Sequence, residues 1–376
     1  MSEIRTIRDP QIDIIKGLGI ICIVAGHCNA PFTDYLYLFH VAVFFISSGY
    51  CYKDKSTESF SELKRFISRK VVTLYLPYVF WISVFSMMHN LFIHLNIYTD
   101  SPLIKAYLSG NYIGTTTYWT CYDIFLNIGK SFLLVGGVQV LGAFWFISTL
   151  FIVLVFYGIS DYVLKGIRSS SFSFQTVLSV LYLIIGFTIK IILPNTLGSL
   201  VGRVLTGYCL LHLGVVLKKY KRFLFDYDNK SIHFITFCLS IMILLICKRI
   251  GNVELGQNEY HDPVFLLVSS IAGWFLLYEL SNFFMCFPKI NNTLVIIGQS
   301  TMSVLIFHFL CFKIINYIGI IFLYPPPKPL FLIAAFPVLF VGRLWWIAYL
   351  LIGTVLPIYM NIIYKKIKKM LFVYRV

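Results

Sequence analysis

The sequence predicts an all-α integral membrane protein with about ten transmembrane helices and with both termini in the cytoplasm. Its 376 residues are 59% hydrophobic and only 12% charged, whereas about 25% of the residues in a soluble domain are charged. Ten apolar segments approach or exceed the roughly 20 residues that a spanning helix needs, and basic residues gather in alternate connections between them. A soluble enzyme, a coiled coil and a disordered chain are therefore excluded.

The expected spans lie at about 11–30, 35–52, 71–95, 141–162, 174–193, 198–217, 231–248, 263–284, 294–317 and 330–363. The first contains Asp13 and Lys16, which makes it a poor signal-peptide core, so it is expected to be retained. The last is interrupted by Pro337 and Arg343, so it is either one tilted helix or a re-entrant piece followed by a helix. No connection is long enough for a soluble domain, and residues 1–376 are expected to form a single transmembrane domain.

Orientation follows from the basic residues, because cytoplasmic loops carry an excess of Lys and Arg. With the N-terminus inside, most of the 31 lysines and arginines fall in the N-terminal stub, the inner connections and the C-terminal tail. The densest run is the connection 53–70. The net charge of +15 is then mainly a topology signal that also attracts anionic membrane lipid. A nucleic acid is not needed as a partner.

The nine cysteines are odd in number and show no CxxC spacing. This pattern argues against a disulfide framework and against a zinc site. Most of the cysteines lie in apolar segments, where they are interpreted as small packing residues. No metal is expected.

The first span carries three ionisable residues, and such residues inside a bilayer are functional candidates because they are costly to insert. Asp13 and Lys16 are three residues apart, and Lys16 and His27 are eleven apart. Eleven helical steps return to within roughly 20° of the same face, with a rise of about 16 Å. All three can therefore face one polar interior. The alternative is that Asp13 and Lys16 merely pair at the inner interface, with Lys16 snorkelling.

The second span returns antiparallel after a short connection and carries His40 near its outer end. The imidazoles of His27 and His40 are therefore expected to approach each other. Ser47, Ser48 and Gly49 follow on the same span, where small residues favour close helix packing over catalysis.

Further polar residues suggest an interior path across the membrane. By their depth in the spans, Arg203 and His308 fall in the outer half, and Glu279 and His212 in the inner half. Histidines are thus expected to gather near the outer mouth of a polar interior.

The motifs of the first two spans resemble membrane acyltransferase family 3, in particular its smaller members similar to fucose 4-O-acetylase, and the resemblance covers the whole chain. The Lys/Arg-x10-His signature is met by Lys16 and His27. The pattern His-x-x-x-Phe-Phe-x-x-Ser-Gly is met by His40, Phe44, Phe45, Ser48 and Gly49. A late Gly, Ser and His run corresponds to Gly298, Ser303 and His308, with Phe307 where a tyrosine is common. The family's Arg-x-x-Arg element is not matched, because Arg65 and Arg69 are four residues apart.

The resemblance implies transfer of an acyl group, usually acetyl, from cytosolic acyl-CoA to a hydroxyl of an envelope glycan or glycolipid in the bacterial cytoplasmic membrane. Acetyl-CoA is the expected donor. The family implies that its phosphates bind the basic connection, and the expected donor-binding residues are Ser48, Lys64, Arg65, Arg69 and Lys70.

The expected catalytic residues are Asp13, Lys16, His27, His40, Arg203 and His308. A neutral histidine suits deprotonation of a sugar hydroxyl, or acylation as a relay. In this scheme His27 is that base or relay, and Arg203 or a second histidine stabilises the oxyanion.

A secondary transporter or a glycan flippase is the alternative function, because ten helices with buried ionisable groups describe those proteins as well. The sequence shows no inverted repeat, which argues against this alternative. It does not identify the acceptor, separate acetyl from succinyl as the acyl group, or indicate an oligomeric state.

Overall fold

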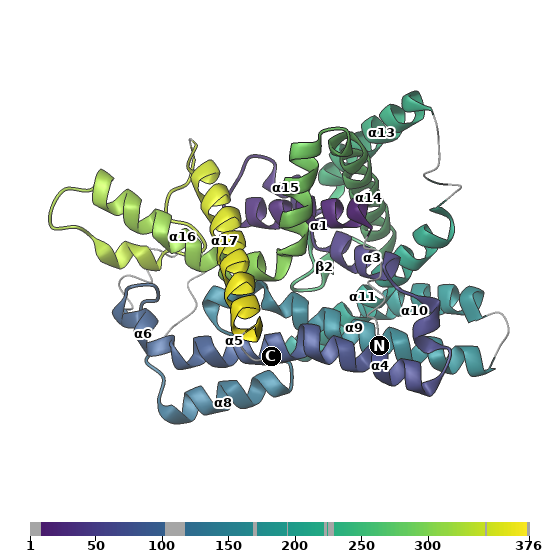
Figure 1. Ribbon diagram of the computed structural model, residues 1–376, viewed down its shortest axis with the longest axis horizontal. Helices are drawn as coiled ribbons and strands as arrows, with labels where there is room; N and C mark the ends of the chain where they lie inside the picture. The colour runs from purple at the N-terminus through teal and green to yellow at the C-terminus, as the bar shows by residue number, and fades with distance from the viewer. Residues whose placement is uncertain are drawn as a thin grey trace. The chain divides into compact units, whose positions relative to one another are not determined.

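The computed structural model describes residues 9–101, 117–167, 171–193, 195–221, 224, 229–342 and 344–373 (Figure 1). The N-terminal stub and Arg343 lie outside this part of the chain. Helices make up most of it, and the strands found within it are β1 (Val253–Glu254) and β2 (Glu259–Tyr260), which form one antiparallel hairpin. The expected all-α membrane fold is confirmed.

The helical elements in chain order are α1 (Pro10–His27), α2 (Thr33–Tyr37), α3 (Ala42–Tyr50), η1 (Asp54–Thr57), α4 (Phe60–Lys70), η2 (Val71–Tyr75), α5 (Leu76–Met87), α6 (His89–His94), α8 (Cys121–Phe132), η3 (Gln139–Phe144), α9 (Trp145–Ile167), α10 (Ser171–Ile192), α11 (Thr196–Lys219), α13 (Lys230–Ile250), α14 (Pro263–Met285), α15 (Pro288–Gln299), α16 (Thr301–Leu323), η4 (Leu330–Ala334) and α17 (Trp345–Val373). Within the described residues, nine helical stretches are long and apolar enough to cross a membrane. Each overlaps one of the expected spans.

The expected second span, 35–52, is not one long helix. The chain forms the short helices α2 and α3, with turns between them at 38–41. Phe39, in the break, packs directly on Gly273 of α14, where a Cβ atom would lie 2.1 Å from the ring. This contact joins segments that are far apart in the sequence, which explains why hydropathy alone does not reveal the break.

Three other spans begin elsewhere than expected. The ninth begins with α16 at Thr301, after α15 has ended at Gln299, instead of at 294. The basic helix α4 continues through the π turn η2 into α5, so the third spanning stretch starts at Phe60. The last expected span is not one continuous helix. The 3₁₀ helix η4 and an irregular segment come first, and α17 follows from Trp345.

The chain divides into two compact units. The first unit comprises Met1–Ile23, Asp34–Lys70 and Thr149–Thr301, and the second comprises Val24–Thr33, Val71–Ser148 and Met302–Val376. In the first unit α3 packs against α11 and α14, α10 packs against α11, and α13 packs against α14. In the second unit α8 lies alongside α5 (Figure 1).

Glycines allow the closest helix contacts of the first unit. A Cβ atom on Gly49 of α3 would lie 1.8 Å from the carbonyl oxygen of Leu211 on α11, and one on Gly214 would lie 2.0 Å from that of Ile46. Likewise, a Cβ on Gly298 of α15 would lie 1.8 Å from the carbonyl oxygen of Asp13 on α1. Only glycine permits backbones to approach this closely.

We expect Gly49→Ala to lower the free energy of unfolding by about 1–3 kcal/mol, because the methyl group must push α3 away from α11. The measurement is thermal unfolding of the protein purified in detergent. Gly129→Ala in α8 is the matched control, since nothing lies within 4 Å of a Cβ there. An unchanged melting temperature for Gly49→Ala would contradict the close contact.

Candidate functional site

Two of the expected catalytic histidines meet in the second unit. His27 is the last residue of α1, and His308 lies on α16. Their ring centroids are 5.4 Å apart, with an angle of 22° between the planes. Phe309 packs against both rings, with centroids 4.8 Å from His27 and 4.0 Å from His308. The structure thus brings together two histidines from opposite ends of the sequence.

The hydrogen bonds of His308 define its tautomer. Its Nδ1 lies 2.9 Å from the carbonyl oxygen of Val304 and 3.1 Å from that of Leu305. Carbonyl oxygens only accept hydrogen bonds, so Nδ1 carries the proton and Nε2 of the neutral ring holds a lone pair. The side chain is 0% exposed, and Nε2 has no hydrogen-bond partner among the residues that the structure describes. A buried acceptor without a partner costs about 1–3 kcal/mol, so this nitrogen is a candidate for a chemical role.

Asp13 and Lys16 have different partners in the first unit. Asp13 Oδ2 accepts a hydrogen bond from Gln299 Nε2 at 3.0 Å, whereas Lys16 Nζ lies 4.0 Å from Cys51 Sγ. Among the ion pairs found in the described residues, none joins Asp13 to Lys16. Simple pairing of the two at the interface is therefore not their arrangement here.

Lys16 belongs to a cluster of cations. Lys16 and Arg69 both interact electrostatically with Lys70, the last residue of α4. The thiol of Cys51 also interacts electrostatically with Lys70. Like charges held together repel one another, so this cluster favours a bound anion. The cluster belongs wholly to the first unit.

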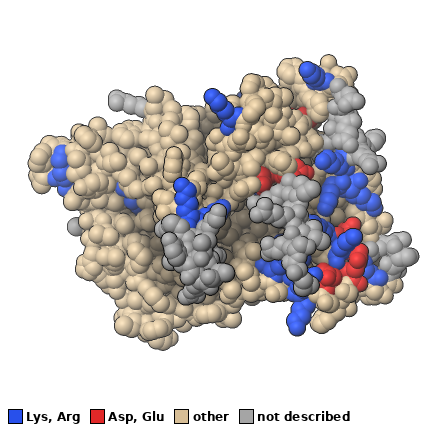
Figure 2. Space-filling model, in the orientation of Figure 1, with Lys and Arg blue, Asp and Glu red and all other residues tan. Residues whose placement is uncertain are grey.

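The two faces of α4 differ. Leu63, Phe66 and Lys70 follow one another at helical spacing on the packed face, whereas Lys64 and Arg65 are exposed. Arg65 pairs with Glu62 at 3.4 Å across one turn of the helix. Figure 2 shows Lys and Arg side chains gathered over α4 and at the C-terminal end of α11. Of the expected donor-binding residues on this helix, Lys70 is thus the one on the packed face.

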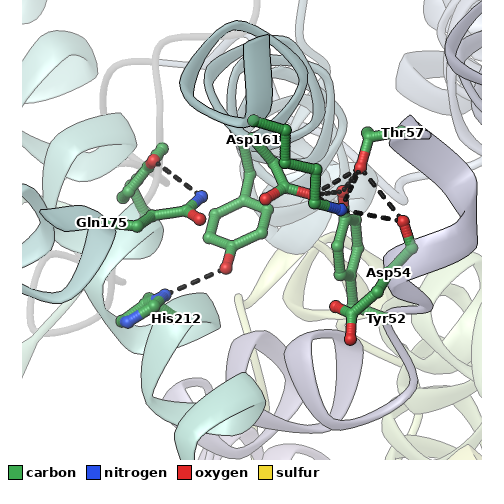
Figure 3. Close-up of polar contacts among 9 residues, drawn as sticks. Tyr52, Asp54, Thr57, Asp161, Gln175 and His212 are labelled. Atoms are coloured by element: carbon green, nitrogen blue, oxygen red, sulfur yellow. Dashed lines mark hydrogen bonds and ion pairs between the residues drawn. The ribbon is translucent and has the colours of Figure 1, made fainter. Parts of the chain in front are cut away.

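A buried network centred on Asp161 of α9 holds the connection from α3 to α4 (Figure 3). Asp161 Oδ2 accepts hydrogen bonds from the hydroxyl of Tyr52 at 2.9 Å and from Thr57 Oγ1 at 2.5 Å. Lys165, one turn further along α9, pairs with the same oxygen at 2.9 Å and donates to the carbonyl oxygen of Asp54 at 2.9 Å. The network therefore fixes the start of the basic segment.

Aromatic packing continues this support into α4. The ring of Phe66 meets that of Tyr52 edge to face, with centroids 5.7 Å apart. Phe66 also packs on Gly158 of α9, where a Cβ atom would lie 3.0 Å from the ring. The packing of Phe66 on α9 thereby fixes the orientation of the face of α4 that carries Lys70.

His212, expected in a polar inner path, is instead fully bonded. Its Nδ1 and Nε2 lie 2.9 Å from the hydroxyl of Tyr157 and 2.9 Å from Thr176 Oγ1, respectively. Thr176 in turn donates to the carbonyl oxygen of Phe172 at 3.0 Å. Both ring nitrogens of His212 have hydrogen-bond partners, which indicates a structural role for this side chain.

The remaining candidates lie in the first unit. His40 Nδ1 donates to the carbonyl oxygen of Leu36 at 2.8 Å, and Ser48 Oγ donates to that of Phe44 at 2.8 Å. Arg203 donates to the carbonyl oxygen of Gly256, between β1 and β2, at 2.6 Å. His40 lies in the first unit and His27 in the second, so their expected approach stays a prediction.

In the first unit Glu279 Oε2 lies within hydrogen-bond distance of His233 Nδ1, at 2.8 Å, a partner that the sequence did not indicate.

Sequence reasoning missed Asp161, Tyr52 and Thr57. A signal was present, since Asp161 is an acidic residue at the end of an expected span and Lys165 follows four residues later. Such a pair ordinarily indicates a solvated helix end. In the described residues, no group of three or more His, Cys, Asp or Glu side chains is placed to hold a metal ion.

Comparison with known proteins supplies the family. The sequence profile described as "Acyltransferase domain" matches residues 9–362, nearly the whole chain. No curated protein and no solved structure matches the chain. The match favours acyl transfer over the transporter or flippase alternative, and it covers both histidines and the basic helix. The chain is therefore a membrane-embedded member of the acyltransferase domain family.

Proposed function

We propose that the protein transfers an acyl group, with acetyl as the first candidate, from cytosolic acyl-CoA to a hydroxyl of an envelope carbohydrate or a lipid-linked glycan in a bacterial cytoplasmic membrane. The observation that carries the proposal is the stacked pair of His27 and His308 in a chain of the acyltransferase family. Within the described residues, Nε2 of His308 has no hydrogen-bond partner. Acyl transfer to a hydroxyl requires a base, and a neutral imidazole in a membrane interior supplies one.

The proposed chemistry needs only a proton acceptor near the reacting hydroxyl. His27 takes the proton as the hydroxyl oxygen attacks the thioester carbonyl. The carbon–sulfur bond then breaks, and the leaving thiolate of CoA receives the proton from the imidazolium. In the alternative relay, the imidazole nitrogen of His27 is itself acylated before the hydroxyl attacks.

The tautomer of His308 refines its role in this scheme. With the proton on Nδ1 bound to backbone carbonyls, Nε2 accepts rather than donates a hydrogen bond. In this tautomer Nε2 has no proton to donate to an oxyanion, so we propose a different role for His308. His308 is better suited to share the proton that His27 removes.

The cluster of Lys16, Arg69 and Lys70 is the proposed site for the phosphates of the donor. Bound phosphate would relieve the repulsion among the three cations and form charge-assisted hydrogen bonds with them. Lys16 and His27 both lie on α1, separated along its axis by about 16 Å at 1.5 Å per residue. The thioester of the donor is proposed to be presented to His27.

We expect His27→Ala to abolish the transfer of label from radiolabelled acetyl-CoA into the glycan and glycolipid extract of membranes, because the base is lost. His94→Ala is the matched control, since His94 is an exposed histidine of α6. The amount of inserted protein is measured for both variants. Retention by His27→Ala of more than about a tenth of the wild-type rate, which is more than general-base catalysis allows, would refute the role of His27.

We expect Lys70→Gln to raise the KM for acetyl-CoA about tenfold with little change in kcat, as for loss of one hydrogen bond to a charged group. Lys64→Gln removes the same charge from the exposed face of α4 and should have much less effect. Thermal stabilisation of the purified protein by acetyl-CoA provides a second measurement. Equal effects of the two substitutions on the KM would contradict the proposal that the donor binds at the packed face of α4.

A further inference from the structure

Residues 330–340, which we call the strap, lie against α16 in the second unit. Leu332 and Ile333 pack with Ile320 of α16, and Leu339 and Phe340 join the same apolar cluster. The strap precedes α17, and its backbone outside η4 has no regular secondary structure. Its polar backbone groups therefore depend on side chains for their hydrogen bonds.

Lys313 of α16 supplies three of these bonds. Its ammonium group donates to the carbonyl oxygens of Ile333 (3.2 Å), Ala334 (3.2 Å) and Ala335 (2.6 Å). The side chain is only 4% exposed, and no carboxylate in the described residues forms an ion pair with it. A buried lysine that binds only backbone carbonyls of one segment holds that segment in place.

Asn316 and Tyr349 complete the attachment. Asn316 Nδ2 donates to the carbonyl oxygens of Ile333 at 3.2 Å and Ala335 at 3.3 Å. The hydroxyl of Tyr349 donates to Asn316 Oδ1 at 2.6 Å and accepts from the amide of Phe340 at 3.2 Å. Both α16 and α17 are thus bonded to the strap.

The strap also reaches the histidine pair through two aromatic rings. Phe336 packs against Phe309 with centroids 4.7 Å apart, and Phe309 contacts both His27 and His308. The ammonium group of Lys313 lies 5.5 Å from the ring centroid of Phe336. The bonds to Lys313 therefore fix a phenylalanine that covers the ring packed on both histidines.

We propose that Lys313, Asn316 and Tyr349 are positioning residues that hold the strap over the histidine pair and keep water from the acyl group. The proposal rests on the proposed function. In a loosened strap, water replaces the acceptor hydroxyl. Its oxygen forms the new bond to the acyl carbon, the carbon–sulfur bond breaks, and one of its protons passes to the thiolate. The acetic acid then loses the other proton to solvent, which yields acetate and free CoA. Positioning of the strap therefore sets the ratio of hydrolysis to transfer.

The test measures two products from radiolabelled acetyl-CoA in membranes that contain the full chain. These are free acetate and label in the extracted glycan and glycolipid. We expect Lys313→Met to raise the ratio of acetate to transferred label about tenfold, as for loss of a hydrogen bond to a charged group. Tyr349→Phe, which keeps the size of the ring, should raise the ratio in the same direction by a smaller factor.

Lys328→Met is the matched control. Lys328 also donates to backbone carbonyls, those of Ile321 at 2.7 Å and of Tyr324, but these lie outside the strap. Its ratio should equal that of the wild type. If Lys313→Met fails to insert, the ratio for Tyr349→Phe decides.

The outcomes separate the two proposals. A raised ratio in Lys313→Met and Tyr349→Phe supports the role of the strap. A parallel fall of hydrolysis and transfer, at an unchanged ratio, overturns it and leaves the proposed function standing. Wild-type membranes that transfer no label would overturn the proposed function itself.

Discussion

The interior of a bilayer offers polar groups no water, so each polar side chain there must find its partner within the protein. This constraint governs the arrangement of the whole chain. Tyr157, His212 and Thr176 satisfy one another in a continuous series of hydrogen bonds. Asp161 is surrounded by donors from Tyr52, Thr57 and Lys165. Nε2 of His308 departs from this pattern, as do a few other buried side-chain atoms, because it has no hydrogen-bond partner within the described residues.

Three membrane-associated lysines meet the same constraint in different ways. Lys16 of α1 and Lys70 of α4 lie near other cations, and the positive-inside rule predicts that the basic connection faces the cytosol. Their repulsion is tolerable where an anionic ligand and water can reach them. Lys313 is buried among neutral carbonyl oxygens, so it gives its hydrogen bonds to the protein itself. The cluster of Lys16 and Lys70 suits the binding of an anion, whereas the contacts of Lys313 suit the positioning of a backbone segment.

The sequence predicts most of the spans because hydropathy depends on local composition, which chain packing does not alter. It does not predict the break at 38–41, since that break depends on Phe39 meeting a glycine far along the chain. His27 and His308 are identifiable as candidates because few ionisable residues lie in spans. Their stacking depends on which helices are neighbours, which a single sequence does not contain. Asp161 was missed because its near neighbour Lys165 makes it resemble an ordinary surface pair.

When it is protonated, the ammonium group of Lys313 responds to the transmembrane potential. It lies in a helix apolar enough to cross the membrane, with no ion pair to a carboxylate of the described residues. A unit charge that crosses the whole bilayer exchanges about 2.3 kcal/mol with a potential of 100 mV. A potential across the membrane draws a protonated Lys313 toward the negative side. In detergent no such force acts on it, and the same carbonyl oxygens hold it unopposed.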